Sequence, residues 1–600
     1  MAASLQSAVQ WLQRGDPLRA ETELSEVLRH NPSDVEALHL RAMARGRLGH
    51  TELAIADFEA AAARHPQRQA VLNNLANLYR RVGRQEEAIA TYRHALQVQP
   101  DYADAGSNLA LTLAEAGEVA EAALAFEAVL ARHPDHMASL NGLGNVRIVQ
   151  EDFPAALTAF DRALDIQPNA VFVLVNRGCL YRTLERPAEA MRDLDQAVRL
   201  APQSPDAQFQ RANTLRNLGQ FDAARAGYVD ALRAAPLRAD IHRNYASLAW
   251  EMGDGARATD LLNTVLRQQP DASLYIVLAE ILMRSGPAAP AEEAASRAVA
   301  LDPRNLRALS LRGELRGRLG RVDEGLADLR LAFANGQGRA AAGGFAIRHQ
   351  LVEALLPAGQ VEEAMDLLEV EPPAEHLQKH VALRATAWRV NGDVRYRQYY
   401  DYDRFTAKRL IETPPGYASL EAFNTALGAE IERLHRTQAQ PLDQTLFGGT
   451  QSAGRLWDQD SPVIRDLARA LEAASVAFVA TLPDDEQHPF LRRKAGELKL
   501  TGAWSVRLRS GGGHVDHIHP AGWISASYYV AVPESVMAGD RAGWLRLGAS
   551  GVAGLELPAE RYIRPEPGYA VFFPSYMWHG VEPFTSDEIR VTAPFDLITV

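Results

Sequence analysis

Four residues with metal-binding or acid–base side chains lie close together near the C-terminal end of the chain. The stretch GGGHVDHIHPAGW contains His514, Asp516, His517 and His519, directly after a run of glycines. A later stretch, PSYMWHGVEP, contributes His579. Imidazole and carboxylate groups are ligands for divalent transition metals, so these residue types at this density indicate a metal site rather than a surface patch of histidines.

The spacing within the first stretch leaves two sets of ligands open. Side chains alternate along a strand, so His514 and Asp516 would point to one side, and His517 and His519 to the other. With His579, the first pair would give two histidines and a carboxylate, the ligand set of non-haem Fe(II) oxygenases. The second pair would give three histidines, which suit zinc equally well. His579 belongs to both sets.

Arg590 lies in the stretch DEIRVTAPFD and is a candidate for binding an anion. A buried guanidinium offers two parallel N–H donors to a carboxylate, such as the distal carboxylate of a keto acid that chelates the metal. Thr592 shares a strand face with Arg590, because two residues separate them. The alternative is that Arg590 only pairs with a nearby acidic residue: Glu582, Asp587 or Glu588.

Short strands and two helices are expected to position these residues. Beyond Leu498, apolar and polar residues alternate with period two between Gly, Pro and Asp turns. The pattern predicts antiparallel strands over residues 502–509, 523–532, 543–548, 569–573 and 589–598. Upstream, residues 419–436 and 461–481 are predicted to be amphipathic helices, and residues 441–460 a loop.

Residues 495–600 resemble the 2-oxoglutarate-Fe(II) oxygenase family found in bacteria and phages. The matching residues are Trp504, His517-x-His519-Pro520, Trp523-x-Ser525, Tyr528-Tyr529-Val530, Gly543-x-Leu545, Pro567-Gly568, Phe572-Phe573-Pro574-Ser575, His579 and Arg590. The resemblance implies a double-stranded β-helix (jelly roll), with Fe(II) and 2-oxoglutarate as cofactors and O₂ as a partner. It favours His517, His519 and His579 as metal ligands, although a His-x-His pair departs from the usual His-x-Asp/Glu.

A repeat of 34 residues fills the first three-fifths of the chain. Prolines recur at Pro32, Pro66, Pro100, Pro134, Pro168, Pro202, Pro236 and Pro270. Alanines recur at Ala20, Ala54, Ala88, Ala122, Ala156, Ala190, Ala224 and Ala258, and glycines at Gly15, Gly49, Gly83, Gly117, Gly219 and Gly253. Glycine permits the turn between two helices, and alanine lets them approach closely. This pattern resembles the tetratricopeptide repeat (TPR), which implies ten or eleven helix pairs stacked as a superhelix with a concave surface.

One position on the first helix of the repeats carries amide side chains. Asn74, Asn108, Asn176 and Asn244 occupy this position, and Gln210 fills it once. A column of amides could hydrogen-bond an extended peptide backbone, and it resembles the asparagine ladder of the O-GlcNAc transferase superhelix. The alternative is that asparagine is simply common at this position. We expect a protein or peptide to bind in the groove.

Composition and charge exclude several classes of protein. The 600 residues include 63 basic and 75 acidic side chains, for a net charge of −12. The chain therefore lacks the basic stripe that nucleic-acid binding requires. Its single cysteine, Cys179, forms neither an internal disulfide nor a thiolate metal site. With no long apolar run and no signal-peptide pattern, we expect a soluble, cytoplasmic protein that binds no membrane.

Three regions are predicted: a TPR superhelix at residues 1–373, a helical linker with supporting helices at 374–494, and a double-stranded β-helix at 495–600. The main functional hypothesis is an Fe(II)/2-oxoglutarate-dependent dioxygenase that hydroxylates a protein or peptide recruited by the repeats. The alternative is a TPR binding scaffold whose β domain is a catalytically degenerate metal-binding jelly roll. A third hypothesis is an oxygenase for a small molecule, in which the repeats serve assembly only.

Overall fold

A computed structural model describes residues 2–65, 68–336, 341–442, 444–452, 454–494 and 496–599. The chain divides into two compact units, Met1–Arg211 and Ala212–Val600, which are described separately. One of the repeat prolines, Pro66, lies outside the described residues. Among the helices that are described, none is long and apolar enough to cross a membrane.

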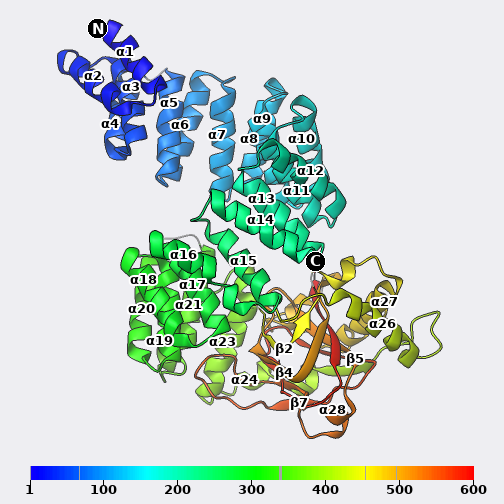
Figure 1. The fold of residues 1–600 in the computed structure, drawn as a ribbon. Coiled ribbons are helices and arrows are strands. Elements are labelled where there is room, and N and C mark those ends of the chain that lie inside the picture. Colours follow the sequence, from blue (N-terminus) through cyan, green and yellow to red (C-terminus); the bar gives the residue numbers. More distant parts are fainter. Residues whose placement is uncertain are drawn as a thin grey trace. The chain divides into compact units, whose positions relative to one another are not determined.

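The first unit is built from consecutive helix pairs (Figure 1). The repeat alanines from Ala20 to Ala190 have no solvent exposure, so each second helix packs directly against its neighbours. The helices are α1 (Ala2–Gln13), α2 (Pro17–His30), α3 (Val35–Leu48), α4 (Thr51–Arg64), α5 (Gln69–Arg81), α6 (Gln85–Val98), α7 (Ala103–Glu115), α8 (Val119–Arg132), α9 (Met137–Val149), α10 (Phe153–Ile166), α11 (Val171–Thr183) and α12 (Pro187–Leu200), followed by α13 (Pro205–Asn217), in which the unit ends.

The turn between the helices of a pair keeps its backbone conformation even where glycine is absent. Gly49 and Gly83 both have a φ of 79°, the left-handed region that glycine enters without steric cost. Two repeats have glutamate at this position, and Glu151 and Glu185 adopt φ values of 59° and 56°. The packing of the helix pairs therefore imposes the turn, and glycine only makes it less strained.

The second unit continues with helix pairs and then adds a sheet. Its further helices are α14 (Phe221–Ala234), α15 (Ala239–Glu251), the 3₁₀ turn η1 (Gly255–Arg257), α16 (Asp260–Gln268), α17 (Ala272–Ser285), α18 (Ala288–Leu301), α19 (Leu306–Arg318), α20 (Val322–Gly336), α21 (Ala341–Leu355), α22 (Val361–Leu367), the 3₁₀ turn η2 (Ala374–His376), α23 (Leu377–Val390), α24 (Tyr396–Tyr399), α25 (Tyr402–Phe405), α26 (Leu420–Leu434), the 3₁₀ turn η3 (Leu456–Asp458), α27 (Pro462–Val479), the 3₁₀ turn η4 (Leu491–Arg493) and α28 (Glu534–Ala538).

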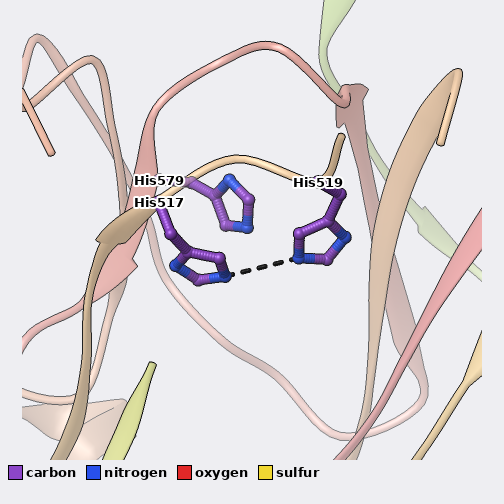
Figure 2. A group of neighbouring side chains, drawn as sticks. All are labelled: His517, His519 and His579. Atoms are coloured by element: carbon purple, nitrogen blue, oxygen red, sulfur yellow. Dashed lines mark hydrogen bonds between the residues drawn. The ribbon is translucent and has the colours of Figure 1, made fainter. Parts of the chain in front are cut away.

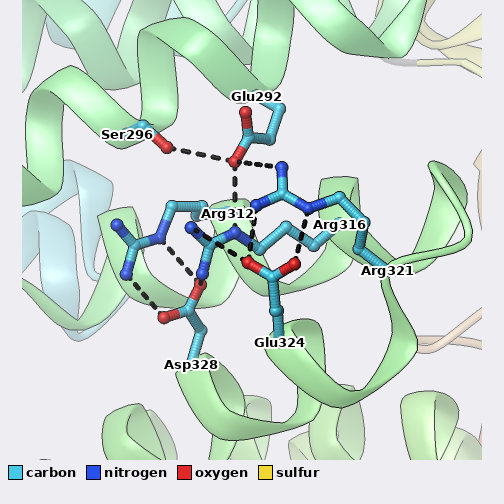
Figure 3. Close-up of polar contacts among 7 residues, drawn as sticks. All are labelled: Glu292, Ser296, Arg312, Arg316, Arg321, Glu324 and Asp328. Carbon is cyan, nitrogen blue, oxygen red and sulfur yellow. Dashed lines mark hydrogen bonds and ion pairs between the residues drawn. The ribbon is translucent and has the colours of Figure 1, made fainter.

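Arginine–carboxylate networks link the helices of the repeats. Arg312 donates two hydrogen bonds to Asp328, at 2.7 and 2.6 Å, and so joins α19 to α20. Arg316 bonds both Asp328, at 2.8 Å, and Glu292 of α18, at 3.1 Å (Figure 3). The same arrangement occurs near the start of the chain, among Arg41, Arg45, Asp57 and Glu21. In both networks each arginine faces at least one carboxylate.

The strands form an antiparallel sheet of ten strands in the described part of the chain. They are β1 (Ala407–Leu410), β2 (Leu446–Gln451), β3 (Leu498–Ala503), β4 (Val506–His517), β5 (Ile524–Ala531), β6 (Leu545–Leu547), β7 (Arg561–Ile563), β8 (Tyr569–Pro574), β9 (His579–Val581) and β10 (Arg590–Thr599). The main strand order is β1-β8-β5-β10-β4-β9-β6-β7, with β2 paired to β4 and β3 to β10. The sheet curls into a half-barrel. The predicted antiparallel β domain is therefore confirmed, and its jelly-roll type stays a prediction.

The predicted elements of this region occur, and further strands accompany them. The two predicted amphipathic helices correspond to α26 and α27, and the five predicted strands overlap β4, β5, β6, β8 and β10. Strands β1 and β2 lie in a segment predicted to be helical or loop-like. The β2 sequence LFGGTQ lacks the alternation of apolar and polar residues, because its centre is Gly448 and Gly449. Both glycines lie against the backbone of β4, with which a side chain would collide.

One hydrophobic core joins the last repeats to the sheet. It extends from Leu326 of α20 to Leu597 of β10. Helices α26 and α27 pack on the sheet, where Phe478 of α27 stacks on Phe572 of β8 with ring centroids 5.1 Å apart. From the other direction, Trp578 donates a hydrogen bond to Thr386 of α23 at 2.9 Å. Helix α23 therefore supports the segment that carries His579.

Candidate metal centre and its cavity

Three histidine side chains converge at one end of the sheet. One ring nitrogen from each of His517, His519 and His579 lies within 4.8 Å of the other two. His517 ends β4, His519 follows in the next turn, and His579 begins β9. Figure 2 shows the three rings facing a common space. The structure thus brings together the three-histidine set that the family resemblance favours.

A bulge in β4 explains why this set meets. On β9, His579 pairs with His517 and Val581 pairs with His514, so the register shifts by one residue between the two pairs. Because His579 and Val581 share a face of β9, their partners His517 and His514 also share a face. The simple alternation expected from the sequence, which separates His514 from His517, is therefore wrong at this bulge.

Asp516 points to the opposite side of the bulge. It accepts two hydrogen bonds from Arg546 of β6, at 2.9 and 2.7 Å, and Arg546 also contacts Glu582 at 3.0 Å. A Cβ on Gly580 would lie only 2.7 Å from Asp516 Oδ1, so glycine is required beneath this ion pair. Asp516 therefore forms an ion pair with Arg546 and does not belong to the histidine cluster.

A hydrogen bond at Nδ1 orients each of the three imidazoles. His517 Nδ1 contacts the Val515 carbonyl at 2.8 Å, and His579 Nδ1 contacts the Met577 carbonyl at 2.9 Å. His519 Nδ1 contacts Asp596 Oδ1 at 2.6 Å. Carbonyl and carboxylate oxygens only accept, so each Nδ1 carries the proton and each Nε2 presents a lone pair to the centre.

Two of the three histidines are held neutral by their surroundings. Burial, with a contribution from the neighbouring His519, lowers the pKa of His517 to about 3. Burial also lowers the pKa of His579 well below its usual value, and the adjacent imidazoles add to the effect. Neutral imidazole is the form that binds metals. His517 and His579 are therefore in the binding form at neutral pH.

The donor set fits a divalent metal ion. Nε2 of His517 and Nε2 of His519 lie 3.3 Å apart, close enough to share a proton or to bind the same metal ion (Figure 2). Each candidate ligand also donates its Nδ1–H to an oxygen acceptor, as metal-bound histidines almost always do, and for His519 this acceptor is the carboxylate of Asp596. Three imidazoles and no directly bound carboxylate suit Fe(II) or Zn²⁺.

A cavity of about 490 Å³ opens next to the histidines. Alternate residues of β10 line it, because residues two apart share a strand face: Arg590, Thr592, Pro594 and Asp596. Trp504 and Pro520 also line it, as do Gln444 and Thr445 from the segment before β2.

Arg590 is buried in this cavity without a carboxylate partner among the described residues. Its exposure is 2%, and its Nε has no hydrogen-bond acceptor. The guanidinium lies over the ring of Tyr529, 5.3 Å from the centroid, and interacts electrostatically with the Tyr529 hydroxyl. Burial lowers the pKa of Arg590. A buried guanidinium whose charge no carboxylate neutralises marks a place for an anionic ligand.

Of the acidic residues near Arg590 in the sequence, two contact other groups, and none forms an ion pair with Arg590 in the described structure. Glu582 pairs with Arg546, and a carboxylate oxygen of Glu588 accepts a hydrogen bond from the Glu534 amide. No ion pair in the described structure joins Arg590 to Asp587. The alternative that Arg590 merely neutralises a neighbouring acid is therefore not supported by this geometry.

Sequence reasoning missed Asp596 and the role of Ser525. Ser525 donates to Asp596 Oδ1 at 2.7 Å and contacts the Ser575 hydroxyl at 2.9 Å. These contacts fix the carboxylate that orients His519. A signal was present in the sequence, because Asp596 is the one charged residue in the apolar stretch APFDLITV. A charge that interrupts a buried strand needs a buried partner.

The amide column of the repeats is engaged within the protein. Asn74 contacts His39 at 2.9 Å, Asn108 donates to Asn73 at 3.2 Å, and Asn176 donates to Asn141 at 2.8 Å. In the second unit, Asn244 donates to Asn213 at 3.0 Å. Gln210 lies at the corresponding position of α13. One N–H of each asparagine thus links adjacent first helices, and a bound peptide would use the remaining amide groups.

Comparisons with known proteins find similarity in two parts of the chain. Residues 502–596 match the family model described as "Putative 2OG-Fe(II) oxygenase". Tetratricopeptide-repeat models match residues 76–117, 107–171, 143–213 and 209–273. Among curated protein sequences, none matches the chain.

Several solved structures are similar to parts of the chain. A tetratricopeptide repeat protein from Parabacteroides merdae is 17% identical over 42% of this chain and 98% of its own, with a TM-score of 0.37. Yeast Tom70 is 14% identical over 67% of this chain and 97% of its own, with a TM-score of 0.39. Pseudomonas aeruginosa PilF is 23% identical over 35% and 96%, with a TM-score of 0.32. The family matches show that this chain carries tetratricopeptide repeats and, in residues 502–596, a domain of the family described as "Putative 2OG-Fe(II) oxygenase".

Proposed function

We propose that the protein is an Fe(II)/2-oxoglutarate-dependent dioxygenase that hydroxylates a protein or peptide recruited by the repeats. The observation that carries the proposal is the pairing, in one cavity, of three converging Nε2 atoms with a buried arginine that has no carboxylate partner. When bound, Fe(II) and 2-oxoglutarate supply the oxidising chemistry that hydroxylates an unactivated C–H bond with O₂, releasing succinate and CO₂.

The residues of the chain have separate tasks in this proposal. His517, His519 and His579 hold the metal through Nε2, and Asp596 keeps His519 in the correct tautomer and orientation. Arg590 binds the distal carboxylate of 2-oxoglutarate, with Thr592 beside it on the same strand face. Burial removes competing water, so the guanidinium–carboxylate attraction is stronger than it would be at the surface.

The size of the cavity and the presence of the repeats favour a large substrate. A cavity of about 490 Å³ holds the keto acid and one inserted side chain, but it does not enclose a large molecule. The repeats would hold the remainder of a polypeptide, with Asn74, Asn108, Asn176, Gln210 and Asn244 as candidate contacts, and so raise its effective concentration at the cavity.

We also propose that the β domain is of the jelly-roll type, that the regions meet at residues 373 and 494, and that the protein is cytoplasmic. A cytoplasmic location suits a chain whose single cysteine, Cys179, has no internal partner with which to form a disulfide.

Anaerobic titration of the full chain with Fe(II) and 2-oxoglutarate tests the proposal. We expect a weak visible charge-transfer band, which His579→Ala abolishes and Arg590→Met shifts to much higher 2-oxoglutarate concentrations. Asp516→Ala should leave the band in place, whereas its loss would favour the alternative ligand set of His514, Asp516 and His579. Absence of the band in the wild-type protein, with zinc or no metal found by elemental analysis, would favour the scaffold alternative.

A further inference from the structure

A fourth histidine, His514, lines the same cavity and has no role in the proposed metal site. Its ring stacks on that of His517, with centroids 5.9 Å apart and an interplanar angle of 22°. The bulge between these two residues turns His514 toward the cavity. His514 does not belong to the group whose ring nitrogens converge.

The Nδ1 of His514 contacts only a hydroxyl among the described residues, whereas Nδ1 of each of the other three histidines contacts a carbonyl or carboxylate oxygen. This hydroxyl belongs to Thr445 and lies 3.4 Å from Nδ1 of His514. Carbonyl and carboxylate oxygens can only accept, but a hydroxyl can also donate. When Thr445 donates to Nδ1, the ring proton of a neutral His514 lies on Nε2. His514 then offers an N–H donor where the other rings offer lone pairs.

The backbone around Thr445 is fixed on two sides. Its carbonyl accepts a hydrogen bond from the Val515 amide at 3.1 Å, next to His514 itself. Just upstream, Arg284 at the end of α17 donates to the Leu442 carbonyl at 3.1 Å. The hydroxyl is therefore held beside the imidazole by the sheet and by the adjoining repeat.

We infer that His514 is a binding residue for the keto acid and donates a hydrogen bond from Nε2 to one of its anionic oxygens. The inference rests on the proposed function, because it assigns a second donor to the ligand that Arg590 binds. Two donors in one cavity, one a guanidinium and one an imidazole N–H, favour an anionic ligand with several acceptor oxygens. His514 would thus strengthen co-substrate binding rather than hold the metal.

Two variants of His514 test whether it binds the keto acid, binds the metal or does neither. His514→Phe keeps a ring to stack on His517 but removes the donor, and His514→Gln is the matched control that keeps an N–H donor. Binding of Mn(II) alone, followed by electron paramagnetic resonance, should change by less than about 3-fold in both variants. Affinity of the Fe(II)-loaded protein for 2-oxoglutarate should fall about 10-fold or more in His514→Phe and much less in His514→Gln. Thr445→Val should produce a smaller loss in the same direction.

Each contrary outcome has a distinct meaning. Loss of Mn(II) binding by a folded His514→Phe variant would make His514 a metal ligand and overturn the inference. Unchanged 2-oxoglutarate affinity in that variant, beside a wild-type protein that binds both Mn(II) and 2-oxoglutarate, would overturn the inference alone. A wild-type protein that binds no Mn(II) would instead overturn the proposed function, and the inference would fall with it.

Discussion

The partly buried arginines of the repeats and the buried arginine of the cavity differ in what neutralises their charge. Arg312 has a bidentate carboxylate partner, Asp328, and the same arrangement recurs between Arg41 and Asp57. Arg590 is more deeply buried and has no such partner in the described structure. A cation removed from water needs a counter-charge. In the repeats a carboxylate side chain supplies this charge, whereas in the cavity we expect an anionic ligand to supply it. The contrast separates a structural polar network from a binding site.

The largest expected effect comes from removing a counter-charge in the repeats. Asp328→Asn leaves Arg312 and Arg316 facing a neutral amide, which should cost about 3 kcal/mol of unfolding free energy. Arg590→Met removes a cation that lacks a partner, so the ligand-free protein should keep or gain stability. Denaturant unfolding of both variants tests the contrast.

A control and a contrary result complete this test. Asp323→Asn lies in the same helix and has no ion pair in the described structure, so it should change stability by less than about 0.5 kcal/mol. If Arg590→Met destabilises the ligand-free protein as much as Asp328→Asn does, Arg590 has a structural role, and the argument for an anionic ligand fails.

The next effect compares two carboxylates beside the histidines. Asp596 contacts His519, whereas Asp516 contacts Arg546. Asp596→Asn should weaken metal binding by about 10- to 100-fold, because the amide no longer fixes the protonated Nδ1 of His519 as strongly. Asp516→Asn should change it only a few-fold. Calorimetric titration with Mn(II) measures both, and the reverse order of effects would favour a metal site built on Asp516.

The pH dependence of stability tests a pair of buried histidines that lies outside the cavity. His349 of α21 and His380 of α23 contact each other at 3.3 Å, and burial lowers their pKa values to about 3 and about 4. The unfolded chain, with a histidine pKa near 6.5, therefore binds more protons than the folded one as pH falls below 6.5. Each histidine should remove about 1.4 kcal/mol per pH unit down to pH 4.

A variant isolates this contribution. His349→Gln should reduce the slope of unfolding free energy against pH by about 1.4 kcal/mol per pH unit between pH 6 and pH 4. Saturating Mn(II) should not alter this reduction. Thermal unfolding over this pH range provides the measurement. An unchanged slope would mean that His349 is protonated in the folded state.

The sequence predicted the repeats well because each signal is local. The alanines, glycines and prolines of a helix pair act on their immediate neighbours, and their regular spacing shows through any single exception. The composition of the cavity was also predictable, since His517, His519, His579, Arg590 and Thr592 were identified by type and by resemblance. What binds each of them was much harder to foresee.

The missed features depend on residues distant in sequence. The bulge between His514 and His517 is defined against β9, more than sixty residues later, and no local pattern marks it. Asp596 meets His519 only when β10 lies beside β4 and β5. Strand β2 is held by close backbone contact at Gly448 and Gly449, which leaves no alternation to read. Tertiary pairing thus decided which of the candidate histidines lie together, a question that spacing left open.

The smallest expected effect concerns a site where tertiary packing overrides local preference. Glu151 holds a left-handed φ of 59° at a turn where other repeats have glycine. Glycine adopts this conformation without the clash that a Cβ causes, so Glu151→Gly should stabilise the first unit by about 0.5 to 1 kcal/mol. Ala128→Gly, in the exposed middle of α8, is the matched control and should cost about 1 kcal/mol. Denaturant unfolding should therefore shift in opposite directions for the same new residue, and a loss of stability in both variants would show that the helix packing does not impose the turn.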